Sequence, residues 1–400
     1  GNSTHCFAPL ACAQGHKVAI LTRRPADWSD TVEVVNDDTD WLPMTKMECK
    51  PELITSDPAL CIPQSDIILI AGVPIHHNPA LLRQIKPHLP AGRKVFIGSV
   101  CAYGGFDWVA HRELEHCCDY SLFGTQLIPW CCGTLEYGKR GIIIGAKRML
   151  RIASEDGTDK DGIKDLLRPI LRQKLVDTDF LASSLWPNNP SLHPPILYGL
   201  FKDWDGKTGF EPSNLPVAIY AEMTDESAKA VCDLDKELVA ITDGLKAKGW
   251  TNKDDFSFTK CVKENYLDQI SDPTDTVTCI RTNKAFAKHK IPYQKVKGTD
   301  MVVPVIAHKF FETDLPFGLV TFKDIAIMCG VATPLIDAII IWNQKLIEKE
   351  YIKESDGSLT GRDIDECIVP SRMGIDLSTL SKGMETKAST KPSPAKKAKK

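Results

Sequence analysis

The stretch that decides the fold is Pro187-Asn188-Asn189-Pro190-Ser191-Leu192-His193-Pro194-Pro195, which contains four prolines in nine residues. Proline lacks a backbone N–H and its ring clashes with the preceding turn, so we expect this stretch to lie outside any helix or central strand. It predicts a joint between two domains, followed by a buried helix that begins at Ile196. His193 would then lie at the mouth of an interdomain cleft, where a general acid or base is useful. A purely structural histidine is the alternative.

The overall composition limits which classes of protein the chain can belong to. The chain has 400 residues, 43% of them hydrophobic, which is enough for two cores of ordinary size. The net charge of -3 gives no reason to expect nucleic acid or a membrane as a partner. The 14 cysteines are scattered and include adjacent pairs that suit no disulfide framework, so we expect reduced thiols. Since there is no long apolar run and no signal pattern, we expect a soluble, cytoplasmic protein.

Residues 1–22 follow the order of a dinucleotide-binding crossover. Gly1-Asn2-Ser3-Thr4-His5 is typical of a glycine turn, Cys6 to Ala13 of a small-residue helix, and Lys17 to Thr22 of a buried strand. In that fold glycines let backbone N–H groups approach a pyrophosphate at the helix N-terminus. The chain opens at Gly1 without an initiator Met, so we expect the first strand and the leading glycines upstream of it. An ordinary Gly-Asn turn before a helix is the alternative.

Two arginines follow the strand that ends at Thr22. No acidic residue follows Arg23 and Arg24 until Asp27. In dinucleotide-binding folds an acid at this position binds the ribose hydroxyls of NAD, whereas arginine accommodates the phosphate of NADP. The pattern favours NADP, or NAD with an arginine stacked on the adenine, and two solvated surface arginines are the alternative.

Three more apolar runs have the character of buried strands. They span Asp66 to Pro74, Lys94 to Ser99 and Gly141 to Gly145, and a helical pattern at Pro79 to His88 separates the first two. This alternation predicts one doubly wound sheet, whose loops at Val73-Pro74 and Tyr103 edge the cofactor cleft. The adjacent His76 and His77 should point to opposite sides, and we expect no metal site.

The second half of the sequence has helical periodicity. Amphipathic patterns begin at Asp225, Asp254 and Ile325, and Gly330 and Pro334 divide the last one. Asp314 lies just before a Leu-Pro-Phe-Gly turn, and we expect it to orient the His193 imidazole and raise the pKa of His193. We expect Lys309 to bind a carboxylate. A helix cap and a surface charge are the alternatives for these two residues.

In several segments the chain resembles the opine dehydrogenases, and most closely the invertebrate octopine dehydrogenase type. The resemblance runs in order from Gly1 to about Leu380. The segments that carry it are Leu192 to Gly199, Trp204-Asp205-Gly206, Arg281 to Lys284, Glu312 to Gly318, Gly330 to Pro334, Lys349-Glu350-Tyr351 and Leu359 to Asp363.

The resemblance implies a two-domain enzyme. An α/β Rossmann-like NAD-binding domain at 1–182 would precede an all-α octopine dehydrogenase domain at 183–383 and a basic disordered tail at 384–400. The implied reaction is the condensation of an amino acid with pyruvate and its reduction by NADH, with NADPH as the alternative. The implied enzyme is a monomer that regenerates NAD in anaerobic glycolysis.

The resemblance also implies roles for individual residues. His193 matches the catalytic histidine of the family and Asp314 its carboxylate partner. The implied cofactor-binding residues are Gly1, Asn2, His5, Arg23, Arg24, Val73 and Pro74, and the implied substrate-binding residues are Lys309, Tyr103, Gln126, Trp130 and Cys132.

The chain departs from the family at two places. Lys309 stands where the family often has arginine, and lysine lacks the bidentate fork. The segment Gly124 to Ile128, which lines the amino-acid pocket in the family, contains no carboxylate to pair with a guanidinium. This favours a small neutral partner such as taurine, glycine or alanine over arginine. A non-catalytic nucleotide-binding homologue that acts as an interaction protein is the alternative function.

Overall fold

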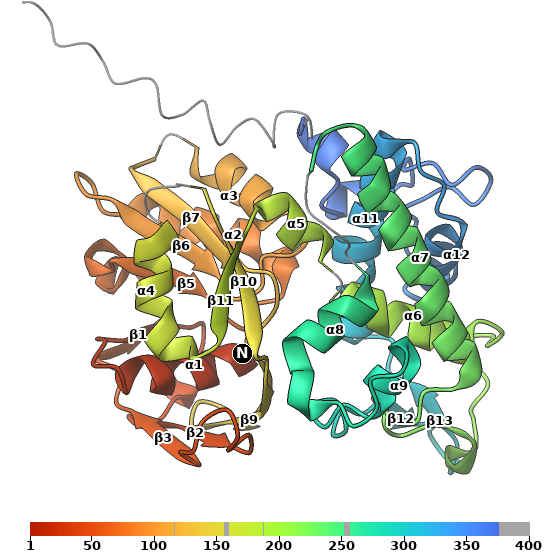
Figure 1. Cartoon of the computed structure of the whole chain (residues 1–400), viewed down its shortest axis with the longest axis horizontal. Helices are drawn as coiled ribbons and strands as arrows, with labels where there is room; N and C mark the ends of the chain where they lie inside the picture. Colours follow the sequence, from red (N-terminus) through yellow and green to blue (C-terminus); the bar gives the residue numbers. More distant parts are fainter. Residues whose placement is uncertain (116, 156–159, 187, 252–256, 376–400) are drawn as a thin grey trace, which may run out of the picture.

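The computed structural model of the chain describes residues 1–115, 117–155, 160–186, 188–251 and 257–375. It consists of two halves that lie side by side, with most strands before residue 187 and most helices after it (Figure 1). The α/β and helical character expected for the two parts of the chain is confirmed. The basic tail predicted at 384–400 and the helix start predicted at Asp254 lie outside the described residues.

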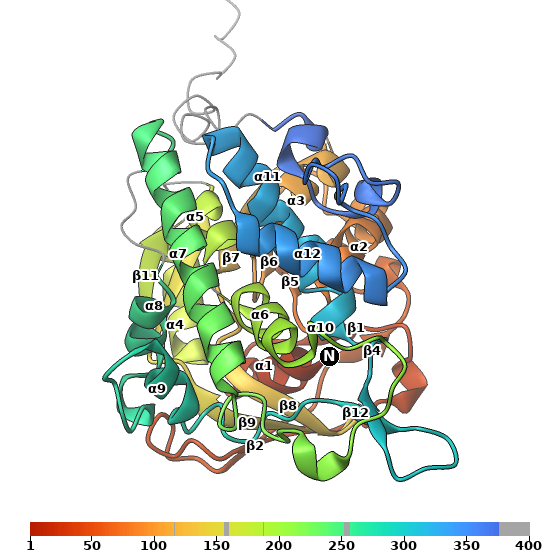
Figure 2. The same cartoon turned by 90° about the vertical axis from the view of Figure 1, so that its right-hand side faces the viewer.

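The main sheet of the N-terminal half has five strands in the order β11-β10-β7-β6-β5. Its strands are β5 (Ile67–Ile70), β6 (Val95–Ser99), β7 (Tyr120–Thr125), β10 (Met149–Ser154) and β11 (Lys174–Thr178). β5, β6 and β7 are parallel to one another, and β10 runs antiparallel to β7. Helix α4 (Lys160–Leu171) covers one face, and α2 (Asn78–Ile85) and α3 (Phe106–Leu114) cover the other (Figures 1 and 2).

A second, four-stranded sheet in the order β3-β2-β9-β8 lies beside the first. It consists of β2 (Val32–Asn36), β3 (Lys46–Cys49), β8 (Trp130–Glu136) and β9 (Arg140–Ala146). The prediction that the apolar run at Gly141 to Gly145 joins the main sheet was wrong, because β9 pairs with β2 and β8 instead. An apolar run identifies a buried strand but not its neighbours. Helix α1 (Asn2–Cys12) packs on this second sheet.

The strand predicted at Lys17 to Thr22 is present as β1 (Ala19–Leu21), and it pairs in parallel with β4 (Leu53–Thr55) alone. β1 and β5, each with one edge unpaired within the described residues, line a common cavity of about 790 Å³ together with α1. The main sheet and the β1-β4 pair are therefore separate in the described part of the chain.

One cystine links two elements of the N-terminal half. Cys12, at the end of α1, forms a disulfide with Cys49 of β3. The expectation that every cysteine is a reduced thiol was therefore wrong for this pair, since residues far apart in sequence can meet across a sheet. The other twelve cysteines, all of them in the described residues, form no disulfide.

The proline-rich stretch forms a helix, contrary to the sequence-based expectation. Helix α6 spans Asn189–Phe201 and includes Pro190, Pro194 and Pro195, while Pro187 lies outside the described residues. Pro190 fits the first turn, where backbone N–H groups have no partner inside the helix. Pro194 and Pro195 remove two hydrogen bonds next to His193, and the burial of nearly the whole first half of the helix stabilises it instead.

The C-terminal half is built around long helices. Besides α6, its described helices are α7 (Asp225–Ala247), α8 (Phe258–Tyr266), α9 (Thr276–Arg281), α10 (Lys309–Glu312), α11 (Val320–Cys329) and α12 (Pro334–Leu346). The predicted helix at Asp225 and the predicted break at Gly330 are confirmed, and Gly330 ends α11 with a φ of 75°. A small hairpin of β12 (Tyr293–Lys295) and β13 (Val302–Pro304) completes this half. Among the described helices, none is both long and apolar enough to cross a membrane.

The two halves share an apolar core. One cluster of buried side chains includes Val95 and Ile97 of β6 as well as Leu234 of α7 and Ile325 of α11. Short helix α5 (Phe180–Leu185) contributes Phe180 to the same cluster. Figure 2 shows α7, α11 and α12 in front of the main sheet. The burial of apolar surface therefore fixes the position of the halves relative to each other.

Candidate active site

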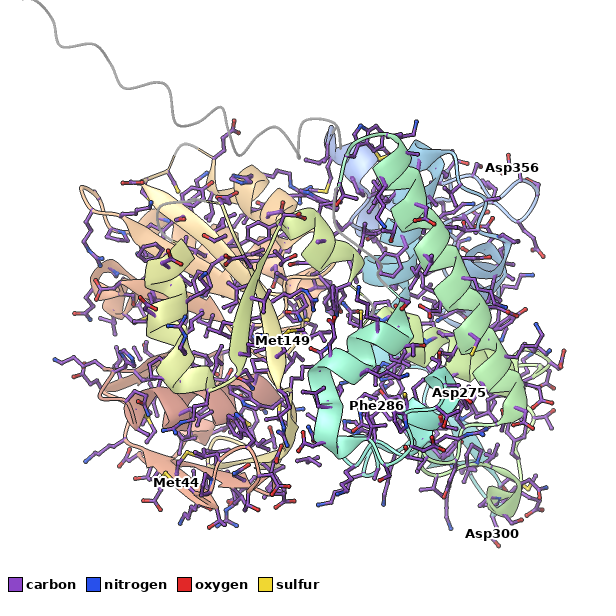
Figure 3. All side chains as sticks on the ribbon, in the orientation of Figure 1. Met44, Met149, Asp275, Phe286, Asp300 and Asp356 are labelled. Atoms are coloured by element: carbon purple, nitrogen blue, oxygen red, sulfur yellow. A yellow bond between two sulfur atoms is a disulfide. The ribbon has the colours of Figure 1, made fainter. Side chains whose placement is uncertain are left out.

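A cavity of about 410 Å³ lies between the two halves. The N-terminal half contributes the start of α1 and the loop after β5, and the C-terminal half contributes α6, α8 and the turn after α10. The marked N-terminus lies at the boundary between the halves (Figure 1). Phe286, which also lines the cavity, lies in the helical half beside α9 (Figure 3).

A histidine and an aspartate form a buried pair in this cavity. His193 Nδ1 lies 2.7 Å from Asp314 Oδ2, and the two residues are 3% and 1% exposed. A neighbouring carboxylate holds the proton on Nδ1 and fixes the tautomer of the ring. Burial lowers the pKa of His193, and the hydrogen bond to Asp314 opposes that shift. The expected effect of Asp314 on the pKa is present, but desolvation outweighs it.

Local packing positions the pair. Asp314 precedes the turn of π-helical type at Leu315–Leu319, in which Gly318 lies against Pro190 of α6. A Cβ on Gly318 would lie 2.2 Å from the Pro190 ring, so only glycine permits this approach. The Phe310 ring covers His193, with the ring centroids 3.8 Å apart. The prolines of α6 and the Leu-Pro-Phe-Gly turn thus bring His193 and Asp314 together.

Tyr220 is a third member of the site that the sequence did not reveal. Its hydroxyl lies 2.8 Å from His193 Nε2, and it lines the cavity. Burial raises the pKa of Tyr220. Tyr220 lies in an irregular segment before α7, where no periodic pattern or motif marks it.

The start of α1 and the loop after β5 form one wall of the cavity. Gly1, Asn2, Val73 and Pro74, which the sequence analysis expects to bind the cofactor, all line this wall. The first turn of α1 has no side-chain cap and no acidic residue. A Cβ on Gly1 would lie 1.9 Å from the carbonyl oxygen of Gly72, so the two backbones touch. Free N–H groups at such a helix N-terminus can hold a phosphate.

Three residues expected to bind the cofactor lie elsewhere. His5 is fully buried and does not line the cavity; its Nδ1 bonds to Gly1 O and its Nε2 accepts from Gly138 N. Both ring nitrogens are therefore occupied, and the structure gives His5 no place at the cavity wall. Arg23 and Arg24 do not line the cavity either, and Arg24 pairs with Asp27 and stacks over Tyr137.

Four of the five residues expected to bind substrate line the cavity. They are Tyr103, Trp130, Cys132 and Lys309. Gln126 does not, because its side-chain oxygen accepts a hydrogen bond from Arg151 N across the main sheet and the residue is fully buried there. The structure therefore places Gln126 away from the cavity wall.

Lys147 is a cavity residue that sequence reasoning missed. Its Nζ donates to Ile128 O at 2.5 Å, and burial lowers its pKa. It occupies the turn between β9 and β10, where a lysine is normally a solvent-exposed residue. Of the residues that line the cavity in the described part of the chain, Asp314 is the only carboxylate.

His76 and His77 do not point apart as expected, since their ring centroids are 3.9 Å apart. The short helical turn that carries them brings the rings to the same side. Within the described ranges, no group of three or more His, Cys, Asp or Glu side chains is arranged to hold a metal ion.

Comparison with known proteins agrees with this geometry. The family described as NAD/NADP octopine/nopaline dehydrogenase, alpha-helical domain, matches residues 176–347. Tauropine dehydrogenase of Arabella iricolor is 31% identical, over 94% of this chain and 96% of the relative. Octopine dehydrogenase of Pecten maximus is 27% identical, over 94% and 95%.

A solved structure of octopine dehydrogenase with NADH and L-arginine has the same fold. It superimposes with a TM-score of 0.78 at 26% identity, covering 96% of each chain. The similarity therefore extends over both halves and includes the segments that form the cavity. The chain belongs to the opine dehydrogenase family.

Proposed function

We propose that this protein catalyses the NADH-dependent reductive condensation of pyruvate with a small neutral amino acid. The observation that carries the proposal is the buried His193–Asp314 pair in a cavity between a dinucleotide-binding-like half and a helical half. We further propose that it acts as a cytoplasmic monomer that regenerates NAD in anaerobic glycolysis.

The residues at the start of α1 fit a dinucleotide. The uncapped first turn offers backbone N–H groups to a pyrophosphate. Because Gly1 and Gly72 have no Cβ, their backbones can pack together beside this turn. Gly1, Asn2, Val73 and Pro74 would hold the cofactor. The bound cofactor would supply the hydride. NADH is the form present in the octopine dehydrogenase structure, and NADPH is the alternative to be tested.

His193 and Asp314 would handle the proton. Asp314 keeps the proton on Nδ1, so proton transfer toward the cavity takes place on the Nε2 side of the ring. A protonated His193 can supply a proton to the keto oxygen of pyruvate as the amine adds and water leaves. The nearby carboxylate stabilises the imidazolium while that proton is held.

The charges in the cavity favour particular substrates. Lys309 and Lys147 provide positive charge for carboxylate or sulfonate groups of the two substrates. Asp314 is already bonded to His193, so the cavity wall in the described residues offers no free carboxylate to a cationic side chain. We therefore propose taurine, glycine or alanine as the amino-acid partner, and not arginine. Tyr103, Trp130 and Cys132 would shape its pocket.

A panel of assays tests the proposal. The protein is mixed with pyruvate, NADH or NADPH, and one amino acid at a time, and the loss of nicotinamide absorbance is followed. We expect turnover with at least one of the three small neutral amino acids and much slower turnover with arginine.

The same panel separates an enzyme from a binding protein. A non-catalytic homologue would enhance the fluorescence of bound NADH but would oxidise it with no amino acid in the panel. Binding without turnover would therefore contradict the proposed activity.

A further inference from the structure

Both nitrogens of the His193 ring have partners in the structure. Nδ1 bonds to Asp314 at 2.7 Å, and Nε2 bonds to the Tyr220 hydroxyl at 2.8 Å. Each imidazole nitrogen makes one hydrogen bond in the plane of the ring. A substrate oxygen can therefore bond to Nε2 only if the Tyr220 side chain moves away. If Tyr220 stays in place, the substrate oxygen contacts the Tyr220 hydroxyl instead.

Tyr220 is held firmly in place. It is 4% exposed, and its ring packs against Phe286 with the centroids 4.8 Å apart. The preceding residue, Ile219, donates its N–H to His289 O at 3.1 Å, which ties the segment to the chain before the hairpin. Moving the hydroxyl away from His193 would break this packing. Tyr220 nevertheless lines the cavity, so a ligand bound there lies next to this residue.

We propose that Tyr220 is a catalytic residue that passes the proton between His193 and the substrate oxygen. The inference rests on the proposed function. In the condensation direction the Nε2–H bond of the imidazolium breaks as an O–H bond to Tyr220 forms, and the original Tyr220 O–H proton moves to the substrate oxygen. The imidazolium loses one proton, the substrate gains one, and the tyrosine is unchanged. The reverse sequence serves oxidation.

The environment of Tyr220 suits a concerted transfer. Burial keeps its pKa above the ordinary value, with Cys131 and Asp314 adding to the shift, so a free tyrosinate is disfavoured. A concerted exchange never forms that anion. Asp314 stabilises the charged state of the ring from the opposite nitrogen.

Tyr220→Phe removes the hydroxyl and keeps the ring that packs on Phe286. We expect kcat to fall about 100-fold or more, as for loss of a general acid, with KM for pyruvate changed less than about threefold. Tyr293→Phe is the matched control. It also removes a tyrosine hydroxyl from this half, one that donates to Pro216 O at 2.9 Å, and Tyr293 does not line the cavity.

A double variant tests whether the two residues act in one transfer. Adding Tyr220→Phe to His193→Gln should lower kcat by less than about threefold more, since residues that act as a unit are not additive. Retention of kcat in Tyr220→Phe within about threefold of the wild type would overturn the relay.

A spectroscopic measurement keeps the test independent of the proposed function. If the wild type oxidises NADH with none of the amino acids, the condensation proposal fails, but the hydrogen bond can still be measured. The ¹⁵N resonances of His193 should report a protonated Nδ1 and an accepting Nε2, and Tyr220→Phe should shift the Nε2 resonance. An unchanged Nε2 resonance would overturn the proposed contact.

Discussion

Asp314 Oδ2 lies 2.7 Å from His193 Nδ1, and this contact joins residues 121 positions apart in the sequence. Each member of the pair is almost fully buried, so neither can be removed without leaving a polar partner unsatisfied. The other ring nitrogen, Nε2, lies 2.8 Å from the Tyr220 hydroxyl on the cavity wall. A buried carboxylate of this kind orients a proton-transferring histidine.

Asp314→Asn should lower kcat about 100- to 10,000-fold, because the amide no longer fixes the Nδ1–H tautomer or stabilises the imidazolium. Since Asp314 raises the His193 pKa against the effect of burial, the variant should titrate His193 at a still lower pH. Steady-state kinetics and ¹⁵N NMR titration measure the two effects. Asp324→Asn is the control, because Asp324 is a buried carboxylate that bonds to Ser371 and does not line the cavity.

Acid should destabilise the fold through buried histidines, of which His193 and His289 are two. Burial lowers the pKa of His193 below 6.5 and that of His289 from 6.5 to about 4. The unfolded chain therefore binds protons that the folded chain excludes, so this stability is present above pH 6.5 and is lost as the pH falls toward about 4. We expect Tm to fall over this range, and less steeply in His289→Gln. Each such histidine adds a slope of at most about 1.4 kcal/mol per pH unit. Equal slopes in the two proteins would contradict the assignment of His289.

Lys309→Met should raise KM for pyruvate about 10- to 100-fold, the usual worth of a hydrogen bond to a charged group. Lys309→Arg keeps the charge and should stay close to the wild type. Initial rates at varied pyruvate concentration measure both variants. If the methionine variant keeps the wild-type KM, Lys309 does not hold the carboxylate.

Gly72→Ala should weaken NADH binding about tenfold or more, since Gly72 has a φ of +67° and a Cβ would lie 2.8 Å from the Gly1 backbone. Fluorescence titration with NADH measures the affinity. Gly15→Ala is the matched control, because Gly15 has a φ of +80° and a Cβ there would meet no atom within 4 Å. Similar losses of affinity in both variants would mean that backbone strain alone, and not the Gly1–Gly72 contact, is responsible.

The sequence predicted where strands and helices occur better than it predicted which strands pair with one another. The runs at Asp66, Lys94 and Gly141 are all strands, but only the structure shows that β9 pairs with β2 and not with the main sheet. Strand pairing depends on which distant segment buries the other face, and no local pattern carries that information. The prolines of α6 were misleading for a related reason, because tertiary burial stabilises a helix that lacks two of its own hydrogen bonds.

The candidate site was predictable where a motif marks it. His193 beside two prolines and Asp314 before the Leu-Pro-Phe-Gly turn are recognisable in the sequence, and they meet in the structure. Tyr220 and Lys147 were missed because they lie in an irregular segment and in a turn. His5 and Gln126 were misplaced because sequence order puts a residue near a site without saying which way its side chain points.

The most direct test of the account is the initial rate of NADH oxidation by the wild type and His193→Ala, with pyruvate and each small neutral amino acid. The account predicts oxidation by the wild type only when both carbon substrates are present, and a rate about 100- to 10,000-fold lower in the variant, which still binds NADH. Equal rates in the two proteins, or oxidation with pyruvate alone, would contradict it.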